Sequence, residues 1–111
     1  MLDRNLIDAL SIAGPPDHRD GEITYPIVYL ESGFGFGLNL VRLDKDQIYG
    51  TGERKLIILM EGMANLHIEG RQSTIRTRLH SKSRSYTVVA NRRHIIEVEE
   101  GPVWLYVYTF P

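Results

Sequence analysis

The sequence predicts an all-β domain of antiparallel strands, with a short helix at the N-terminus. From Glu22 onward, runs rich in Ile, Val, Tyr and Thr recur at roughly ten-residue spacing, separated by glycines and charged residues. Helices do not separate these runs, which excludes a parallel α/β fold. About eight strands in one small domain must close or pack as two sheets to protect their edges, so a sandwich, a barrel and a jelly roll are the candidate architectures.

The first expected element is a helix over residues 2–10, whose apolar residues form one helical stripe: Leu2, Leu6, Ile7 and Leu10. The sequence GPP that starts at Gly14 ends this helix. The expected strands are 23–30, 34–43, 55–61, 63–69, 72–79, 84–89, 94–99 and 103–110. A chain of 111 residues has room for one hydrophobic core, so we expect a single domain over 1–111, in which 1–20 form the helix and a Pro-rich connection.

Glycines supply the expected connections. EGM at 61–63, EGR at 69–71 and EEGP at 99–102 are typical of tight turns. GFGFG at 33–37 is not expected to bind phosphate, because a phosphate-binding loop needs a helix directly after it, and the following LNLVRLD has the pattern of a strand.

Composition excludes several classes of protein. The chain has no cysteine, which rules out disulfide scaffolds, zinc ribbons and thiol nucleophiles. The N-terminus has no long apolar run, so we expect a soluble cytoplasmic protein with no membrane partner.

Residues 71–94 are locally basic, although the net charge of the chain is only −1. This segment holds no Asp or Glu and seven cations: Arg71, Arg76, Arg78, Lys82, Arg84, Arg92 and Arg93. They are typical of a solvated outer sheet face. The alternative is attraction of an anionic ligand, with a nucleic acid as the less favoured partner.

Two stretches resemble the conserved motifs of the cupin superfamily. KLIILMEGMANLHIEG at 55–70 resembles the first motif, in which a strand ends in Glu-Gly, turns and continues to a second Gly. SYTVVANRRHIIEVEEGPVWLYVYTF at 85–110 resembles the second, in which a turn and a histidine lead into a strand, a loop and a final apolar strand. The resemblance implies an antiparallel jelly-roll β-barrel.

The resemblance also implies where a metal would bind, and this chain departs from that pattern. Metal-dependent cupins bring two histidines and a Glu in the first motif and one more histidine in the second. Here Lys55 stands at the place of the Glu, and 48–51 hold no histidine, so only His94 matches. Val89 and Asn91 stand where the family's Pro and Gly usually stand. One imidazole opposite an ammonium does not hold a divalent cation, so we expect neither a metal nor another cofactor.

The other histidines offer an alternative metal site that the sequence leaves open. Alternation places His67 on the face opposite Ala64 and Leu66, toward solvent or a partner sheet. His18 lies in the N-terminal connection, and His80 lies at a strand end among polar residues.

His94 and Lys55 are the leading candidates for a ligand site in the barrel. The imidazole titrates near neutral pH, and Lys55 is able to neutralise a carboxylate or a phosphate. Tyr49, Arg42 and Tyr86 are expected to join them at the cavity rim. Because no carboxylate is expected there, the cavity should be net positive.

Three functions follow from this site. The first is a metal-free, cupin-like binding protein for an anionic or sugar-like small molecule. The second is a metal-independent isomerase, epimerase or cyclase in which His94 is the catalytic acid or base. Glu97 is not expected to orient this histidine, because its odd spacing turns it to the other face. The third is a structural dimerisation domain with a filled pocket.

A homodimer is also expected. The segment ITYPIVYL at 23–30 carries apolar residues on both faces, more than a small monomer usually exposes. Pro26 confines this strand to a sheet edge, where it could lie against a partner.

Overall fold

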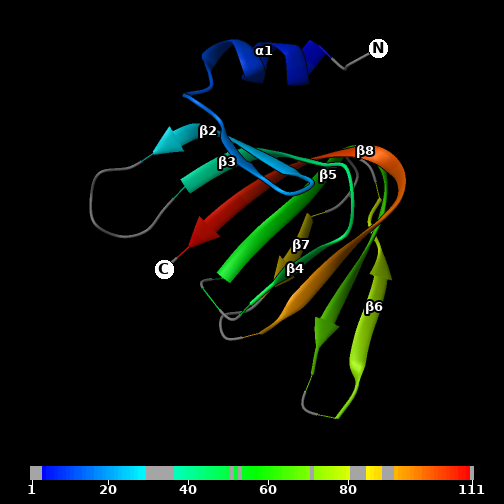
Figure 1. Ribbon diagram of the computed structural model, residues 1–111. Coiled ribbons are helices and arrows are strands. Elements are labelled where there is room, and N and C mark those ends of the chain that lie inside the picture. The colour runs from blue at the N-terminus through cyan, green and yellow to red at the C-terminus, as the bar shows by residue number, and fades with distance from the viewer. Residues whose placement is uncertain are drawn as a thin grey trace.

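The computed structural model describes residues 4–29, 37–50, 52, 54–70, 72–80, 85–88 and 92–110. Within these ranges the chain forms a helix followed by antiparallel strands (Figure 1). The elements are α1 (Arg4–Ile12), β1 (Asp17–Arg19), β2 (Glu22–Tyr29), β3 (Gly37–Leu43), β4 (Gln47–Tyr49), β5 (Arg54–Glu69), β6 (Thr74–Arg78), β7 (Ser85–Val88) and β8 (His94–Phe110). The predicted all-β fold with a short N-terminal helix is confirmed.

Two long strands form the backbone of the fold. β5 and β8 pair antiparallel from Arg54↔Phe110 at one end to Ile68↔His94 at the other. The register shifts between Leu59 and Ala64, so both strands bend together near their middle.

The bend corrects an expectation about the turns. EGM and EEGP were expected to separate four strands, but each pair of expected strands is one bent strand, because the β5–β8 ladder continues through the bend. Gly62 lies there with a φ of 91°, and a Cβ on it would meet the carbonyl oxygen of Pro102 at 2.8 Å. A glycine is therefore required for the close approach of the two backbones.

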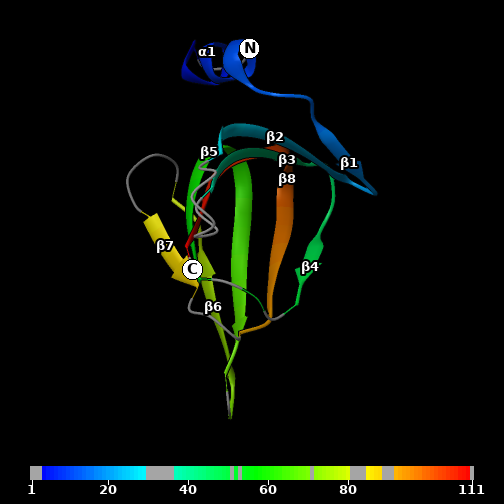
Figure 2. The ribbon, with the colours of Figure 1, turned by 90° about the vertical axis from the view of Figure 1, so that its left-hand side faces the viewer.

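The bent strands contribute to two layers. The first layer contains β1, β2, β3, the C-terminal half of β8, the N-terminal half of β5, and β7. The second contains β4, the N-terminal half of β8, the C-terminal half of β5, and β6. Figure 2 shows β4 on one side of the β5–β8 pair and β6 and β7 on the other. The predicted barrel is not closed, since no ladder among the described residues joins its outer strands.

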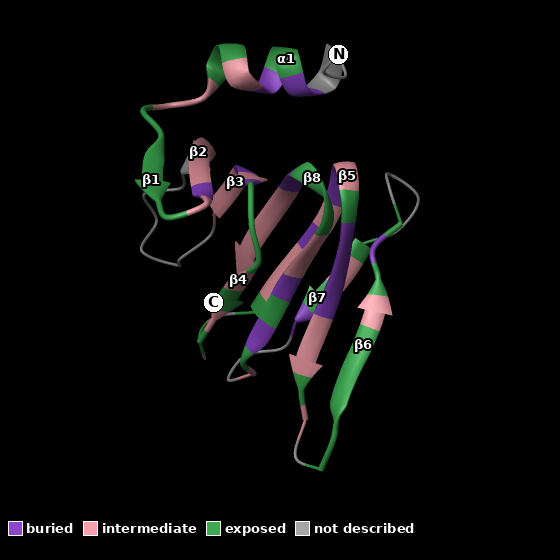
Figure 3. Cartoon of the chain, turned by 45° about the vertical axis from the view of Figure 1, so that its right-hand side comes forward, coloured by how far each residue is buried: buried purple, intermediate pink, exposed green. Residues whose placement is uncertain are grey.

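Apolar side chains fill the space between the layers. This core draws on β3, β5, β7 and β8, and on one residue just after β6: Val41, Leu43, Ile57, Leu59, Ala64, Leu66, Leu79, Val88, Ile96, Val103 and Leu105. Buried positions run along β5 and β8, whereas β6 is largely exposed (Figure 3). Alternation along the strands therefore places every second side chain of the two long strands inside.

The helix covers the outer face of the first layer. Leu6 and Ala9 of α1 pack with Leu40, Met60 and Trp104 in a second apolar cluster. Figure 1 shows α1 above β2 and β3. Both faces of the first layer therefore carry buried apolar residues.

β2 carries the apolar segment that motivated the expected dimer. Tyr25 and Ile27 pack against the cluster beneath α1, so the chain itself covers part of this surface. Among the described strands β1 pairs only with the start of β2, and the carbonyl of Pro26 accepts a hydrogen bond from the Gly14 N–H at 2.8 Å. The homodimer stays a prediction.

Some expected boundaries differ from the structure. The helix extends to Ile12, two residues beyond its expected end, and its expected start lies outside the described residues. The short strands β1 and β4 were not expected, because three-residue segments carry too little alternation to recognise. Most of GFGFG lies outside the described residues. Among the described residues, no helix has the length and apolar character needed to cross a membrane.

Candidate functional site

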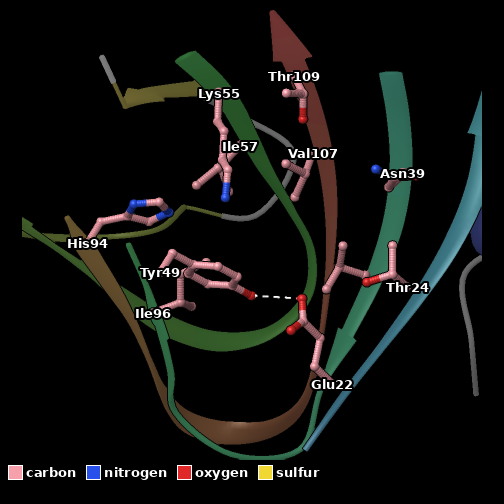
Figure 4. Close-up of a pocket in the computed structure, with 11 residues that line it drawn as sticks. Glu22, Thr24, Asn39, Tyr49, Lys55, Ile57, His94, Ile96, Val107 and Thr109 are labelled. Carbon is pink, nitrogen blue, oxygen red and sulfur yellow. Dashed lines mark hydrogen bonds between the residues drawn. The ribbon is translucent and has the colours of Figure 1, made fainter. Parts of the chain in front are cut away.

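A cavity of about 110 Å³ lies between the two layers. Its walls come from β2, β3, β4, β5 and β8 (Figure 4). The described residues that line it are Glu22, Thr24, Asn39, Val41, Tyr49, Lys55, Ile57, His94, Ile96, Val107 and Thr109. The cavity thus combines apolar side chains with several polar groups, as small-molecule sites usually do.

Three of the predicted site residues meet in this cavity. Tyr49 and His94 are cross-strand neighbours, and their rings stack with centroids 4.9 Å apart at 17°. The Lys55 ammonium lies 4.3 Å from the centroid of the Tyr49 ring. Lys55 comes from the first layer and His94 from the second, and Figure 4 shows both pointing into the same space.

Glu22 is a cavity residue that sequence reasoning missed. Its side chain is buried, and its Oε1 accepts a hydrogen bond from the Tyr49 hydroxyl at 3.0 Å. Burial raises the pKa of Tyr49 well above its usual range, and the Glu22 carboxylate raises it further. The expectation of a net positive cavity is wrong, because Glu22 brings a negative charge to balance Lys55.

His94 is almost completely enclosed, with 3% of its surface exposed. Neither of its ring nitrogens has a hydrogen-bond partner among the described residues. Burial lowers the pKa of His94 to about 4, and Lys55 contributes in the same direction. The backbone of Arg92 acts to raise the pKa of His94, although it does not form a hydrogen bond of good geometry with the ring. The ring is therefore neutral at pH 7 and offers one donor and one acceptor.

Uncharged polar groups complete the cavity wall. Thr24, Asn39 and Thr109 line it from β2, β3 and β8. Sequence reasoning missed all three. The signal was present for Asn39, a polar residue in phase with the apolar Val41 and Leu43 of the same strand.

Arg42 and Tyr86 were expected at the cavity rim, but neither residue lines the cavity. Arg42 is out of phase with the inward-facing Val41, so its guanidinium lies 5.7 Å from the Trp104 ring centroid and pairs with Asp44 at 3.2 Å. Tyr86 packs against the core, and its hydroxyl donates to the Arg78 carbonyl at 2.9 Å.

The described residues do not fit a divalent metal. Among them, no group of three or more His, Asp or Glu side chains converges on one point. His94 has an ammonium as its neighbour, which opposes a second positive charge. His18 and His80 are exposed.

His67 lies on the outer face of the second layer, as alternation predicted. Its Nε2 is 3.7 Å from Glu97, which also accepts a hydrogen bond from the buried Asn65 at 3.0 Å. Glu97 therefore points away from His94, in agreement with its odd spacing.

The basic segment is partly neutralised on this outer face. Arg76 lies 3.3 Å from Glu97, and Arg78 lies 3.5 Å from Glu99. Cross-strand pairing thus brings carboxylates from β8 to cations of β6. Arg71, Lys82 and Arg84 lie outside the described residues.

Comparison with known proteins identifies the fold. No family model matches the chain, and no curated protein matches it significantly. Hydroxypropylphosphonic acid epoxidase from S. wedmorenis superposes with a TM-score of 0.71 at 14% identity, over 86% of this chain and 55% of that one. Its complex with fosfomycin gives 0.71 at 13% identity over the same shares. A variant of oxalate decarboxylase from Bacillus subtilis gives 0.69 at 15% identity, over 92% of this chain and 28% of that one.

The chain spans about half the length of the epoxidase and less of the decarboxylase. Identities this low relate the folds alone. Both neighbours are cupin-fold proteins, and the chain described here has a cupin-like fold.

Proposed function

We propose that this chain is a metal-free small-molecule binding protein whose anionic or sugar-like ligand occupies the cavity between the layers. The observation that carries the proposal is His94, which is buried and has no hydrogen-bond partner among the described residues. Leaving a buried polar group unsatisfied costs about 1–3 kcal/mol, so a ligand that supplies the missing partners recovers this cost on binding.

The cavity composition supports the same function. Lys55 provides a charge for an anion, and Thr24, Asn39 and Thr109 provide hydrogen bonds for hydroxyl or carboxylate oxygens. The volume of about 110 Å³ is below the roughly 150 Å³ of an engineered cavity that holds benzene. The ligand, or the part of it that enters, is therefore small. A structural dimerisation domain would not need such a space, and filling it with side chains would stabilise the fold.

Acid–base catalysis by His94 is the second candidate, favoured by the exposure of its ring to the same cavity as Lys55. A lysine beside a neutral imidazole is a suitable pair for moving a proton and stabilising an oxyanion. Against it, a histidine with a pKa of about 4 is a weak base, and Glu97 is turned away. Binding is therefore the function that the geometry supports best.

Native mass spectrometry of the purified protein tests the proposal. We expect a co-purifying small molecule, or a ligand from a panel of carboxylates and sugars that raises the melting temperature. Lys55→Met and His94→Gln should each weaken binding, whereas Arg42→Gln, which changes a cation outside the cavity, should leave binding intact.

Three results would contradict the proposal. Stoichiometric, tightly bound zinc, iron or manganese would refute the metal-free site. Binding that survives both cavity substitutions would place the ligand on the exterior arginines. A protein that binds nothing from the panel and carries nothing from the cell would leave the cavity without a function.

A further inference from the structure

Resting on the proposed function, we infer that the cavity takes a small monocarboxylic acid together with one proton. The carboxylate lies between Lys55 and His94, and His94 holds the proton. This inference names the chemical class of the ligand and couples its binding to pH.

The charges in the cavity select a monoanion. Of the described residues that line it, Lys55 and Glu22 carry opposite formal charges, which cancel. A bound monocarboxylate adds one negative charge to a poorly solvated space, where uncompensated charge is strongly disfavoured. Protonation of His94 restores neutrality. A dianion such as oxalate leaves one excess negative charge even after that protonation.

The position of His94 makes it the group that accepts the proton. Its ring is 3% exposed and without hydrogen-bond partners among the described residues, so a protonated ring gains a partner for its second N–H only from a ligand. In Figure 4 the outer edge of the imidazole faces the side of the cavity where Lys55 lies. A carboxylate there accepts hydrogen bonds from both cations.

The other groups around His94 determine how strongly the proton uptake depends on the ligand. Within the cavity, Lys55 of β5 opposes protonation, and Glu22 of β2 is the carboxylate that lines the same space. Tyr49 of β4 stacks on the ring and stays neutral, because its pKa is raised. A second depression shares His94 with the ionisable residues His67, Glu69 and Arg93, of which Glu69 and Arg93 pair at 3.9 Å. In the free protein His94 is neutral at pH 7, so the bound anion is what makes the ring take up a proton.

The apolar residues that line the cavity set the size of the acid. Val41, Ile57 and Val107 form an apolar surface for a short aliphatic body, and Thr24 and Asn39 lie beside it to bond a hydroxyl group. Lactate has these features within the volume available, so it is a suitable probe.

Isothermal titration of L- and D-lactate into the full chain at pH 7, in two buffers with different ionisation enthalpies, measures the proton uptake directly. We expect close to one proton taken up per lactate bound. The Kd should rise by about tenfold per pH unit as the pH increases. Oxalate, inorganic phosphate and neutral lactamide should bind more weakly, and glucose tests the sugar-like class.

Variants assign the proton to its residue. His94→Gln should abolish proton uptake and raise the Kd on the order of tenfold to a hundredfold, because a charge-assisted hydrogen bond is lost. Lys55→Met should also raise the Kd, and Arg42→Gln should change neither quantity. Circular dichroism checks that each variant folds. The measurement of proton uptake in two buffers uses the unchanged protein, so it holds even where a variant fails to fold.

The outcomes separate this inference from the proposed function. Tighter binding of oxalate, phosphate, lactamide or glucose overturns the monocarboxylate and leaves a binding protein. Lactate binding without proton uptake, or uptake that persists in His94→Gln, overturns the role of His94. Binding of no compound in the panel overturns both proposals.

Discussion

Replacing His94 with glutamine should remove a pH dependence from the stability of the fold. The pKa of His94 is about 4 in the folded chain, against 6.5 for an ordinary histidine. Between these values the unfolded chain binds a proton that the folded chain does not, so the free energy of unfolding falls as the pH falls. This contribution is fully present above pH 6.5 and is lost on acidification toward pH 4.

The two pKa values give the size of the effect. A difference of one pKa unit corresponds to 1.36 kcal/mol, so the change from 6.5 to about 4 amounts to about 3 kcal/mol at most. This is a large part of the about 5–15 kcal/mol that stabilises a typical domain. Burial is the main cause, so the effect should persist in high salt, although the part due to Lys55 is open to some screening.

Urea unfolding between pH 7.5 and pH 4.5 provides the assay. Trp104 is the single tryptophan and is 4% exposed, so its fluorescence should report the loss of the core. The difference in unfolding free energy between the unchanged protein and His94→Gln should vary by about 2.5 kcal/mol across the range. The same pH profile in both proteins would refute the reasoning, because it would show that His94 does not titrate differently on folding.

Ile96→Val provides a matched control. Ile96 lines the same cavity and is 2% exposed, and its shortening should cost about 0.5–1.5 kcal/mol. Because no titrating group is removed, this cost should be the same at every pH. A pH-dependent cost would mean that any loss of packing near the cavity alters the titration.

Further predictions concern the same walls and the bend. Tyr49→Phe should cost about 1.5–3 kcal/mol by removing the hydrogen bond to Glu22, and much of that loss should disappear in a Glu22→Gln background, as a double-mutant cycle in urea would measure. The unchanged protein should lose stability as the pH rises above about 10, where Tyr49 ionises in the unfolded chain but not in the folded one, and Tyr49→Phe should lose less. Leu66→Ala should cost about 2–5 kcal/mol by leaving a cavity in the core, seen as a lower urea midpoint with an unchanged slope. Gly62→Ala should cost about 2 kcal/mol or more, because the φ is positive and the new Cβ meets backbone; an unchanged melting temperature would contradict this.

Local pattern determined the class of fold. β-branched and aromatic residues in alternating runs indicated most strands to within a few residues, and GPP indicated the end of the helix close to its place. The same period placed His67 and Glu97 on the outer face. These properties depend on neighbours in the chain, so the sequence alone was sufficient for them.

Tertiary structure decided how the strands join and where the sheet bends. Glycines typical of turns occur at 62 and 101, but β5 pairs with β8 on both sides of these glycines, with register shifts between them, so the two expected turns are bends within long strands. The ladder between these strands joins residues far apart in the chain, and local turn propensity does not report such pairing.

Tertiary structure also decided the composition of the candidate site. Lys55 and His94 were expected in one cavity, but Glu22 entered it because the pairing of β2 with β3 turns its side chain inward. Arg42 was excluded because it is out of phase with the inward-facing Val41. The sequence did not reveal this phase, because the helix on the outer face lets β3 carry apolar residues on both sides. The net charge of a cavity is the sum of the charged side chains that strands distant in sequence bring to it, so only the folded chain determines it.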